Sequence, residues 1–283
     1  MKPVTAQTRV FAVIGDPIGH SLSPIFWNAA FAATGIDAIY TAFRVTREHL
    51  SAAVRGLAAL GVVGFNVTSP HKNAIISELR SLLPPADILR AVNTVRCEED
   101  GSMVGTNTDA LAMISLLEER EPPRSALLLG AGGAASAVFW GLCQRNTPVV
   151  YCANRTPGRS VCPLSAPRTE IVSLDWNESS LKEAVERVDM VINATPLGRH
   201  PEERILPLLS MNARQTYVDL VYSEDSRLLA DARSAGAAVI NGREFLIRQG
   251  MAAFSFLTGV SAPEAAIRGS LAMDHPYDES VRV

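Results

Sequence analysis

The segment Ser125–Leu142, which reads SALLLGAGGAASAVFWGL, constrains the fold more than any other part of the chain. Its run Ala126–Leu129 is short and continuously apolar, as expected for a strand buried on both faces of a parallel sheet. A glycine-rich turn follows at Gly130, and apolar residues at helical spacing continue to Leu142. The order of strand, glycine turn and helix predicts an α/β domain built on a parallel sheet.

The glycine turn has the G-x-G-x-x-A form of a dinucleotide-binding fingerprint. Gly130 permits a tight turn, Gly132 lets a pyrophosphate approach the backbone, and Ala135 lets the helix pack closely on the strand. The unpaired N–H groups at the start of the helix would then face the anion. Tight strand–helix turns and methyltransferase loops share this pattern, so the motif needs support from the next strand.

The next predicted strand, Pro148–Cys152, ends in a basic loop that favours NADP over NAD. An NAD enzyme usually carries an acidic residue here to bind the ribose hydroxyls. This chain has Asn154, Arg155 and Thr156 instead, with Arg159 just beyond. A guanidinium suits a 2′-phosphate, so the loop predicts an NADP site. The alternative is a solvent-exposed loop that is basic by chance.

Length, composition and charge limit the number of domains and the classes of partner that the chain could have. The chain has 283 residues, of which 47% are hydrophobic, and this length is sufficient for two domains. Its formal net charge is -3. A net charge this close to zero does not indicate binding to nucleic acid or to an anionic membrane. We expect no signal segment and no membrane span. The four cysteines lack metal-ligand spacing, which favours reduced thiols in a cytoplasmic protein and no metal site.

Polar side chains follow four predicted strands in the first half of the chain. These strands are Arg9–Ile14, Val62–Val67, Ala91–Val95 and Gly101–Thr106, and the last two are expected to pair as a hairpin. The polar residues that accompany their ends are Ser21, Ser23, Asn66, Thr68, His71, Lys72, Asn93, Asn107, Thr108 and Asp109. Open α/β sheets bind ligands at the carboxyl ends of their strands, so the set predicts a ligand site.

Each of these residues also has a simpler explanation. Ser21 or Ser23 could cap the following helix, and Asp109 could complement a helix dipole. Lys72 is expected in a loop at a helix start, where a cation is electrostatically unfavourable, and that favours a functional role. His71 is expected to orient its neighbours or to face solvent. Helix capping explains the residues singly but not their recurrence at four strand ends.

Several stretches together resemble the shikimate dehydrogenase family. In order they read GDPIGHSLSP, NVTSPHK, AVNTV, GTNTDA, LLLGAGGAA, ANRT, INATPLG, VDLVY and REFLIRQGMAAF. The resemblance extends from Val13 to about Gly259 and includes the quinate-active and shikimate-dehydrogenase-like branches. It implies an N-terminal α/β substrate domain, a doubly wound Rossmann-type NADP-binding domain and a cleft between them. The implied activity is reversible hydride transfer between NADP(H) and a ring hydroxyl of shikimate.

The resemblance also implies roles for individual residues. The catalytic acid–base pair would be Lys72 and Asp109. The substrate would be bound by Ser21, Ser23, Asn66, Thr68, Asn93, Tyr222 and Gln249. The cofactor would be bound by Gly130, Ala131, Gly132, Gly133, Ala134, Asn154, Arg155, Thr156, Arg159 and Thr195. A lysine, or a lysine–aspartate pair, suits the acid–base step of alcohol oxidation.

The expected domains are 1–108 for substrate, 109–242 for NADP, and 243–283 for C-terminal helices that return to the first domain. Two loops depart from the family pattern, at Arg199-His200 and at Ser223-Glu224. These departures leave open the same chemistry on quinate or an aminoshikimate, although serine at position 23 favours shikimate by analogy. A non-catalytic NADP-binding regulator and a folate-pathway dehydrogenase are further alternatives. The expected partner is a small cyclic polyhydroxy carboxylate, with the protein acting as a monomer or homodimer.

Overall fold

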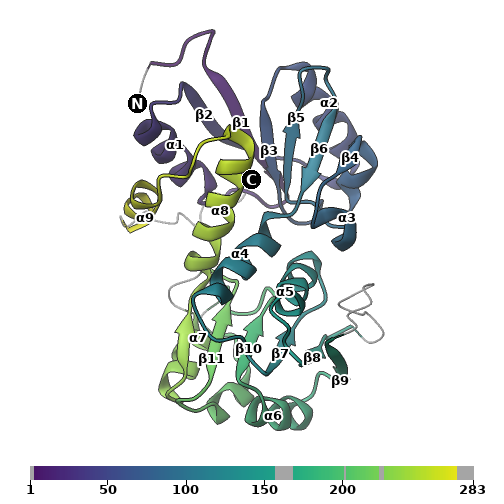
Figure 1. The fold of residues 1–283 in the computed structure, drawn as a ribbon, viewed down its shortest axis with the longest axis vertical. Coiled ribbons are helices and arrows are strands. Elements are labelled where there is room, and N and C mark those ends of the chain that lie inside the picture. The colour runs from purple at the N-terminus through teal and green to yellow at the C-terminus, as the bar shows by residue number, and fades with distance from the viewer. Residues whose placement is uncertain (1–2, 157–167, 201, 223–225, 273–283) are drawn as a thin grey trace. The chain divides into compact units, whose positions relative to one another are not determined.

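The computed structural model describes residues 3–156, 168–200, 202–222 and 226–272, which form two compact units (Figure 1). One unit contains the chain up to Thr108 and from Gln249 onward, and the other contains Asp109–Arg248. Each unit contains one six-stranded sheet, so the predicted α/β class is confirmed. Helices α4 (Thr108–Glu118) and α8 (Gly242–Thr258) both continue across the division between the units.

The first unit contains a mixed sheet with the strand order β2-β1-β3-β5-β6-β4. Its strands are β1 (Arg9–Gly15), β2 (Ala38–Arg44), β3 (Gly64–Val67), β4 (Ser81–Leu82), β5 (Thr94–Cys97) and β6 (Met103–Thr106). Its helices are α1 (Ser23–Thr34), η1 (Arg47–His49), α2 (Leu50–Ala59), η2 (Ala74–Glu78), α3 (Ala86–Leu89) and α9 (Glu264–Ala272). Strands β2, β1 and β3 are parallel, whereas β3, β5 and β6 pair antiparallel, which confirms the expected hairpin.

Successive side chains along each strand point to opposite faces of this sheet, and both faces are buried. On one face, Ile14 of β1 and Phe65 of β3 pack against Val54 of α2. On the other face, the ring of Trp27 in α1 lies 4.7 Å from the Tyr40 ring and 5.2 Å from the Phe254 ring of α8 (centroid distances). The part of α8 that begins at Gln249 therefore completes the core of the first unit.

The second unit contains an all-parallel sheet with the order β12-β11-β10-β7-β8-β9. Its strands are β7 (Ser125–Leu129), β8 (Val149–Ala153), β9 (Glu170–Leu174), β10 (Met190–Asn193), β11 (Thr216–Asp219) and β12 (Ala238–Ile240). Its other helices are α5 (Gly133–Gln144), α6 (Glu178–Arg187), η3 (Leu206–Ser210) and α7 (Arg227–Ser234). The chain winds outward from β7 in both directions, which is the doubly wound Rossmann order.

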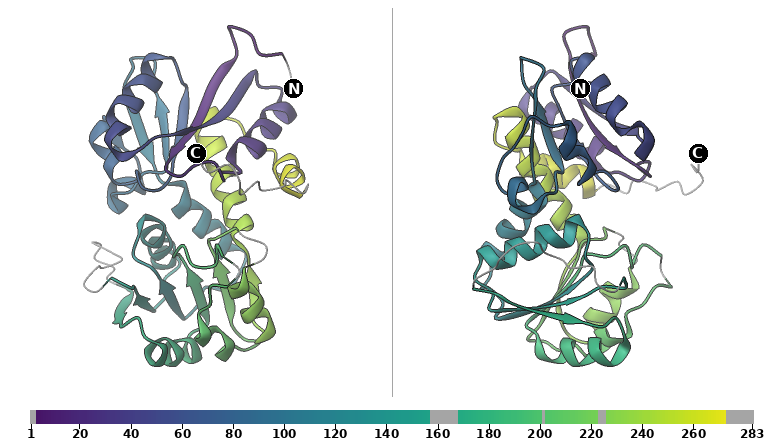
Figure 2. Two further views of the ribbon diagram at one scale, coloured as in Figure 1. Left: turned by 180° about the vertical axis from the view of Figure 1, so that it is seen from behind. Right: turned by 90° about the vertical axis from the view of Figure 1, so that its right-hand side faces the viewer.

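Both faces of the parallel sheet are covered by helices (Figure 2). Met113 of α4 and Phe139 of α5 pack on one face, and Leu181 of α6 and Leu228 of α7 pack on the other. This double coverage explains why the strands read as continuous apolar runs rather than as alternating ones.

Two predicted elements differ from the structure in detail. The strand expected over 91–95 begins only at Thr94. Before it, the Val92 N–H donates to the Lys72 carbonyl in a turn rather than to a strand, although the backbone of Asn93 pairs with Val67 and Thr106. The helix expected over 47–60 begins with the short 3-10 helix η1 before α2. In the part of the chain that the structure describes, no helix has the length and apolarity needed to cross a bilayer.

The aromatic cluster around Trp27 predicts a large effect of truncation. Trp27 is fully buried, and Trp27→Ala removes its contacts with Phe11, Phe31, Tyr40 and Phe254. We expect the free energy of unfolding to fall by about 3–5 kcal/mol, measured by urea denaturation. Leu60→Ala is the control, because Leu60 is 83% exposed and its loss should change stability by less than about 0.5 kcal/mol. Equal effects of the two substitutions would contradict this core.

Candidate functional site

In the first unit, the loops that follow β1 and β3 lie side by side. The Thr68 N–H donates to the Ile14 carbonyl at 2.9 Å, and the Asp16 N–H donates to the Ser69 carbonyl at 3.0 Å. A Cβ added at Gly15 would lie 2.4 Å from Cγ2 of Thr68, so this close approach requires glycine. The turn bearing Thr68 and the loop that leads to Ser21 and Ser23 therefore share one edge of the sheet.

The two serines at the start of α1 do not cap it. The N-cap residue is Leu22, and no side chain forms the cap hydrogen bond. Instead, Oγ of Ser21 accepts a hydrogen bond from the N–H of Ser23 at 3.3 Å. Capping of α1 by Ser21 or Ser23 is therefore wrong, and Pro24 lies in the first turn of the helix as expected.

Asn66 is the centre of a buried hydrogen-bond network at the end of β3. Its Oδ1 accepts from the Tyr40 hydroxyl at 2.7 Å, and its Nδ2 donates to the Asn93 carbonyl at 3.1 Å and to Thr94 Oγ1 at 3.0 Å. Burial raises the pKa of Tyr40 well above its usual value, so the phenol stays protonated and donates. The amide of Asn66 is thereby fixed in orientation.

Asn93 extends this network to the start of α4. Its Oδ1 accepts from the Thr108 N–H at 2.7 Å, from Thr108 Oγ1 at 3.1 Å and from Thr94 Oγ1 at 3.0 Å. Asn93 thus satisfies an N–H group at the helix start, a group that has no partner within the helix. Asp109, which follows Thr108 directly, is only 5% exposed.

Lys72 lies in the turn between β3 and η2, a short 3-10 helix that begins at Ala74. Its side chain is half-buried, and its carbonyl accepts a hydrogen bond from the Val92 N–H at 2.7 Å. The neighbouring His71 is fully buried, with Nε2 2.6 Å from the Val45 carbonyl. The expectation that His71 faces solvent is therefore wrong, and its ring anchors the turn that carries Lys72.

The structure brings together only part of the predicted site in one unit. The members in the first unit are Ser21, Ser23, Asn66, Thr68, Lys72, Asn93 and Gln249. The members in the second unit are Asp109, Gly130, Ala131, Gly132, Gly133, Ala134, Asn154, Arg155, Thr156, Thr195 and Tyr222. Arg159, Ser223 and Glu224 lie outside the described residues, and Arg199 and His200 are exposed.

The glycine turn of the second unit has the geometry of a phosphate cradle. Gly130 has a φ of +110°, and a Cβ there would lie 2.9 Å from the Ala194 carbonyl oxygen. A Cβ added at Gly132 would meet no atom within 4 Å, so open space borders the backbone where α5 begins at Gly133. The first N–H groups of α5 can therefore bind an anion. Ala131 is 8% exposed and packs in the core, so only its backbone is available.

The loop after β8 presents a basic side chain. Nδ2 of Asn154 donates to the Thr156 carbonyl at 2.9 Å, which closes a small turn around Arg155. Arg155 and Thr156 are exposed. No acidic residue follows β8 directly, so the loop suits a phosphate better than a free ribose hydroxyl pair.

The loop after β10 is held by a buried network that the sequence analysis did not single out. Asn193 Oδ1 accepts from the Thr195 hydroxyl at 2.6 Å and from its N–H at 3.0 Å, while Asn193 Nδ2 donates to the Leu197 carbonyl at 2.8 Å. The same Nδ2 donates to Oδ1 of Asp219 at 3.0 Å. Asp219 is fully buried, and burial raises its pKa to about 6 despite the hydrogen bonds that it accepts.

A second carboxylate holds the far side of this loop. Oε2 of Glu203 accepts from the N–H groups of Gly198 at 2.8 Å and His200 at 3.3 Å.

The signal that could have identified Asn193 and Asp219 from the sequence is their position at the last residue of a buried strand. Most of their donors lie two residues away, but the bond that joins Asn193 to Asp219 spans 26 positions and is not connected by sequence spacing.

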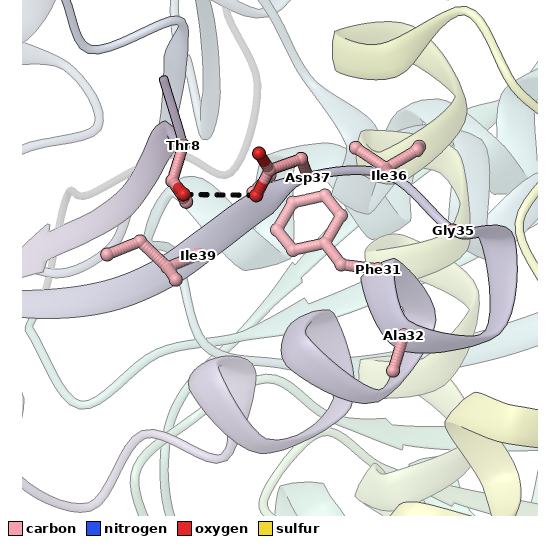
Figure 3. Close-up of a pocket in the computed structure, with 8 residues that line it drawn as sticks. Thr8, Phe31, Ala32, Gly35, Ile36, Asp37 and Ile39 are labelled. Carbon is pink, nitrogen blue, oxygen red and sulfur yellow. Dashed lines mark hydrogen bonds between the residues drawn. The ribbon is translucent and has the colours of Figure 1, made fainter. Parts of the chain in front are cut away.

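A cavity of about 260 Å³ lies elsewhere in the first unit (Figure 3). It is lined by Thr8, Phe31, Ala32, Gly35, Ile36, Asp37, Ala38 and Ile39. Asp37 accepts a hydrogen bond from the Thr8 hydroxyl at 3.0 Å. These residues precede β1 and β2 or begin β2, so the cavity is at the opposite end of these strands from the polar cluster. None of the predicted site residues lines it. Within the described ranges, no group of acidic, histidine or cysteine side chains could hold a metal ion.

Comparisons with known proteins agree with this arrangement. Residues 13–95 match a family model described as the shikimate dehydrogenase substrate binding domain. The chain is 40% identical over 277 residues to a shikimate dehydrogenase (NADP(+)) of an Anaeromyxobacter species, covering 95% of this chain and 98% of the relative. The Aquifex aeolicus shikimate dehydrogenase structure superposes with a TM-score of 0.86 at 34% identity, covering 96% of this chain and all of that one. A Thermus thermophilus shikimate 5-dehydrogenase in complex with NADP(H) and shikimate gives 0.82 at 31% identity, covering 93% and 98%.

The buried carboxyl of Asp219 predicts a pH-dependent stability difference. Its pKa is about 6 in the fold and about 3.9 in an unfolded chain, so the fold favours the protonated form. That stabilisation is complete below about pH 4 and is lost as pH rises through about 6. Asparagine does not ionise. We expect the stability of Asp219→Asn relative to wild type to rise by about 3 kcal/mol between about pH 4 and pH 7.5, measured by urea unfolding. The two proteins share every other titrating group, so a difference that is constant with pH would contradict the shift.

Proposed function

The chain belongs to the shikimate dehydrogenase family, and on that premise we propose that it catalyses the NADP-dependent interconversion of shikimate and 3-dehydroshikimate. One observation carries the proposal. A single chain combines a lysine-bearing polar cluster at the strand ends of a mixed sheet with a Rossmann turn followed by a basic loop. An alcohol dehydrogenase needs both parts, because one positions the hydroxyl and the other positions the hydride acceptor.

The first unit supplies the groups for a cyclic polyhydroxy carboxylate. Ser21 and Ser23 offer hydroxyls for the substrate carboxylate, and Thr68 lies on the neighbouring turn. Asn66 and Asn93 are held by the buried network, which lowers the entropy cost of binding ring hydroxyls. The remaining proposed substrate contacts are Gln249, at the start of the returning segment, and Tyr222, which belongs to the second unit.

The second unit supplies groups that fit NADP. The open backbone at Gly132 and the start of α5 suit the pyrophosphate, and Arg155 suits the 2′-phosphate. The remaining proposed contacts are Gly130, Ala131, Gly133, Ala134, Asn154, Thr156, Arg159 and Thr195. When bound, the nicotinamide supplies the hydride acceptor for alcohol oxidation.

Lys72 and Asp109 form the proposed acid–base pair. In oxidation, bound NADP would accept the hydride from the substrate C–H bond, and the side chain of Lys72 would accept the hydroxyl proton. In reduction, the Lys72 ammonium returns that proton to the developing alkoxide. Asp109 would orient the ammonium and the reacting hydroxyl. The buried ring of His71 limits the motion of the turn that carries Lys72.

The proposal also covers the domain assignment, the partner, the cellular location and the oligomeric state of the enzyme. The domain assignment is residues 1–108 and the returning C-terminal helices for substrate, and 109–242 for NADP. The net charge of -3 supports a small-molecule substrate rather than nucleic acid or a membrane as the partner. We place the enzyme in the cytoplasm, in the chorismate pathway of aromatic amino acid biosynthesis, as a monomer or homodimer.

Replacement of Lys72 tests the catalytic role. We expect Lys72→Ala to lower kcat for shikimate oxidation by about 10²–10⁴-fold, because the general acid–base is lost. NADP affinity, measured by fluorescence titration, should be unchanged. Lys182→Ala is the matched control, because Lys182 is exposed on α6. Full activity of a Lys72→Ala protein that binds NADP would overturn the proposed mechanism.

Replacement of Arg155 tests the cofactor assignment. We expect Arg155→Ala to raise KM for NADP by about 10–100-fold, because a charged hydrogen bond to the 2′-phosphate is lost. The KM for NAD, which lacks this phosphate, should change little. Arg214→Ala, at an exposed arginine elsewhere in the unit, provides the comparison. An equal rise for both cofactors would mean that Arg155 does not read the 2′-phosphate.

A further inference from the structure

Two adjacent strands of the second unit, β10 and β11, end in one connected set of side-chain hydrogen bonds, and β7 lies beside β10. Asp219 ends β11, Asn193 ends β10, and Gly130 follows β7, and these strands are neighbours in the sheet (Figure 1). Asp219 Oδ1 accepts from Asn193 Nδ2 at 3.0 Å and from the Val221 N–H at 2.9 Å. Asp219 Oδ2 accepts from the Tyr217 hydroxyl at 3.1 Å.

Asn193 transmits this constraint to the loop that follows β10. Its Oδ1 accepts both the N–H and the hydroxyl of Thr195, and its Nδ2 binds the Leu197 carbonyl. The loop in turn packs on the glycine turn, since a Cβ at Gly130 would lie 2.9 Å from the Ala194 carbonyl oxygen and 3.3 Å from Thr195 Cγ2. Displacement of Asn193 would therefore move the loop against the phosphate cradle.

The position of this loop in the sheet determines which half of a dinucleotide it meets. The strand order reverses between β7 and β10, and open α/β sheets bind dinucleotides at that switch point. The adenosine half then extends toward β8 and Arg155. The other half, which carries the nicotinamide, extends toward β10 and the Thr195 loop.

We propose that Asp219, acting through Asn193, is a positioning residue that holds the Thr195 loop and the Val221 backbone against the nicotinamide half of the cofactor. This inference rests on the proposed NADP-dependent function. Asp219 is fully buried, and in this role it acts by fixing the groups that contact the cofactor.

A purely structural role explains Asp219 less well. Burial disfavours its charged form, so an apolar residue would fill the same space at lower cost to the fold. The carboxylate instead collects three donors from three different residues. Tyr217 is the titratable group that faces it, and burial raises the pKa of that phenol well above its usual value, so it remains a donor.

The test compares how a substitution affects use of the whole cofactor with how it affects binding of the adenosine half alone. Asp219→Ala removes the acceptor for Asn193, and we expect kcat/KM for NADP, measured with shikimate, to fall at least about tenfold. Inhibition by adenosine 2′,5′-bisphosphate, which contains only the half near Arg155, should change less than about twofold. Asp219→Asn keeps an acceptor oxygen for Asn193 and Val221 and should restore most of kcat/KM.

Asp231→Ala is the matched control. Asp231 is also buried in this unit, but it is paired with Arg204 and Arg227 rather than with the Thr195 loop. Its loss should lower stability without changing KM for NADP. Equal weakening of NADP and of the bisphosphate in Asp219→Ala, or failure of Asp219→Asn to restore activity, would overturn the inference.

Two further measurements keep the outcomes distinct. If Asp219→Ala does not fold, Asn193→Ala tests the same link by removing the donor to Leu197, with the same selective loss expected. If wild-type protein binds NADP without oxidising shikimate, only the proposed function fails. NADPH and bisphosphate binding to the variants would then still decide the positioning role. Wild-type protein that binds neither nucleotide would overturn both.

Discussion

Parallel pairing of adjacent strands is the constraint on which the polar cluster of the first unit and the glycine turn of the second unit both depend. Strands that run in the same direction end at the same edge of a sheet, so residues far apart in sequence become neighbours there. In the first unit, β1 and β3 bring the serine loop beside the turn with Thr68 and Lys72. In the second unit, β7, β8 and β10 bring together the glycine turn, the basic loop and the Thr195 loop.

Buried side-chain networks fix these edges where backbone pairing ends. Asn66 and Asn93 join β3 to the start of α4 in the first unit, and Asp219 and Asn193 join β11 to the loop after β10 in the second. In each case an amide side chain both donates and accepts, so its orientation is determined by its partners. Such preorganisation reduces the ordering cost of binding a polar ligand. Each unit thus uses the same kind of buried amide network at the strand ends of its sheet.

The sequence predicted the strands and the cofactor turn well because their signals are local. Continuous apolar runs identified β7 and β8, and the spacing of Gly130, Gly132 and Ala135 identified the turn between β7 and α5. Most of the failures involve contacts between distant segments. His71 is buried because its ring reaches Val45, and the backbone of Asn93 is held between Val67 and Thr106. One failure is local, since the serines do not cap α1. Asp219 has two donors close by in the chain, Tyr217 and Val221, but its link to the loop after β10 depends on the distant Asn193, which no local motif indicates.

Steady-state formation of NADPH or NADH by the purified wild-type protein tests the central claim most directly. Shikimate and quinate would each be assayed with NADP and with NAD, under identical conditions. We predict efficient oxidation of shikimate with NADP and much weaker reaction in the other three combinations. Efficient oxidation of quinate with NAD, or tight binding of NADP with no turnover of either acid, would contradict the assignment of substrate and reaction to this site.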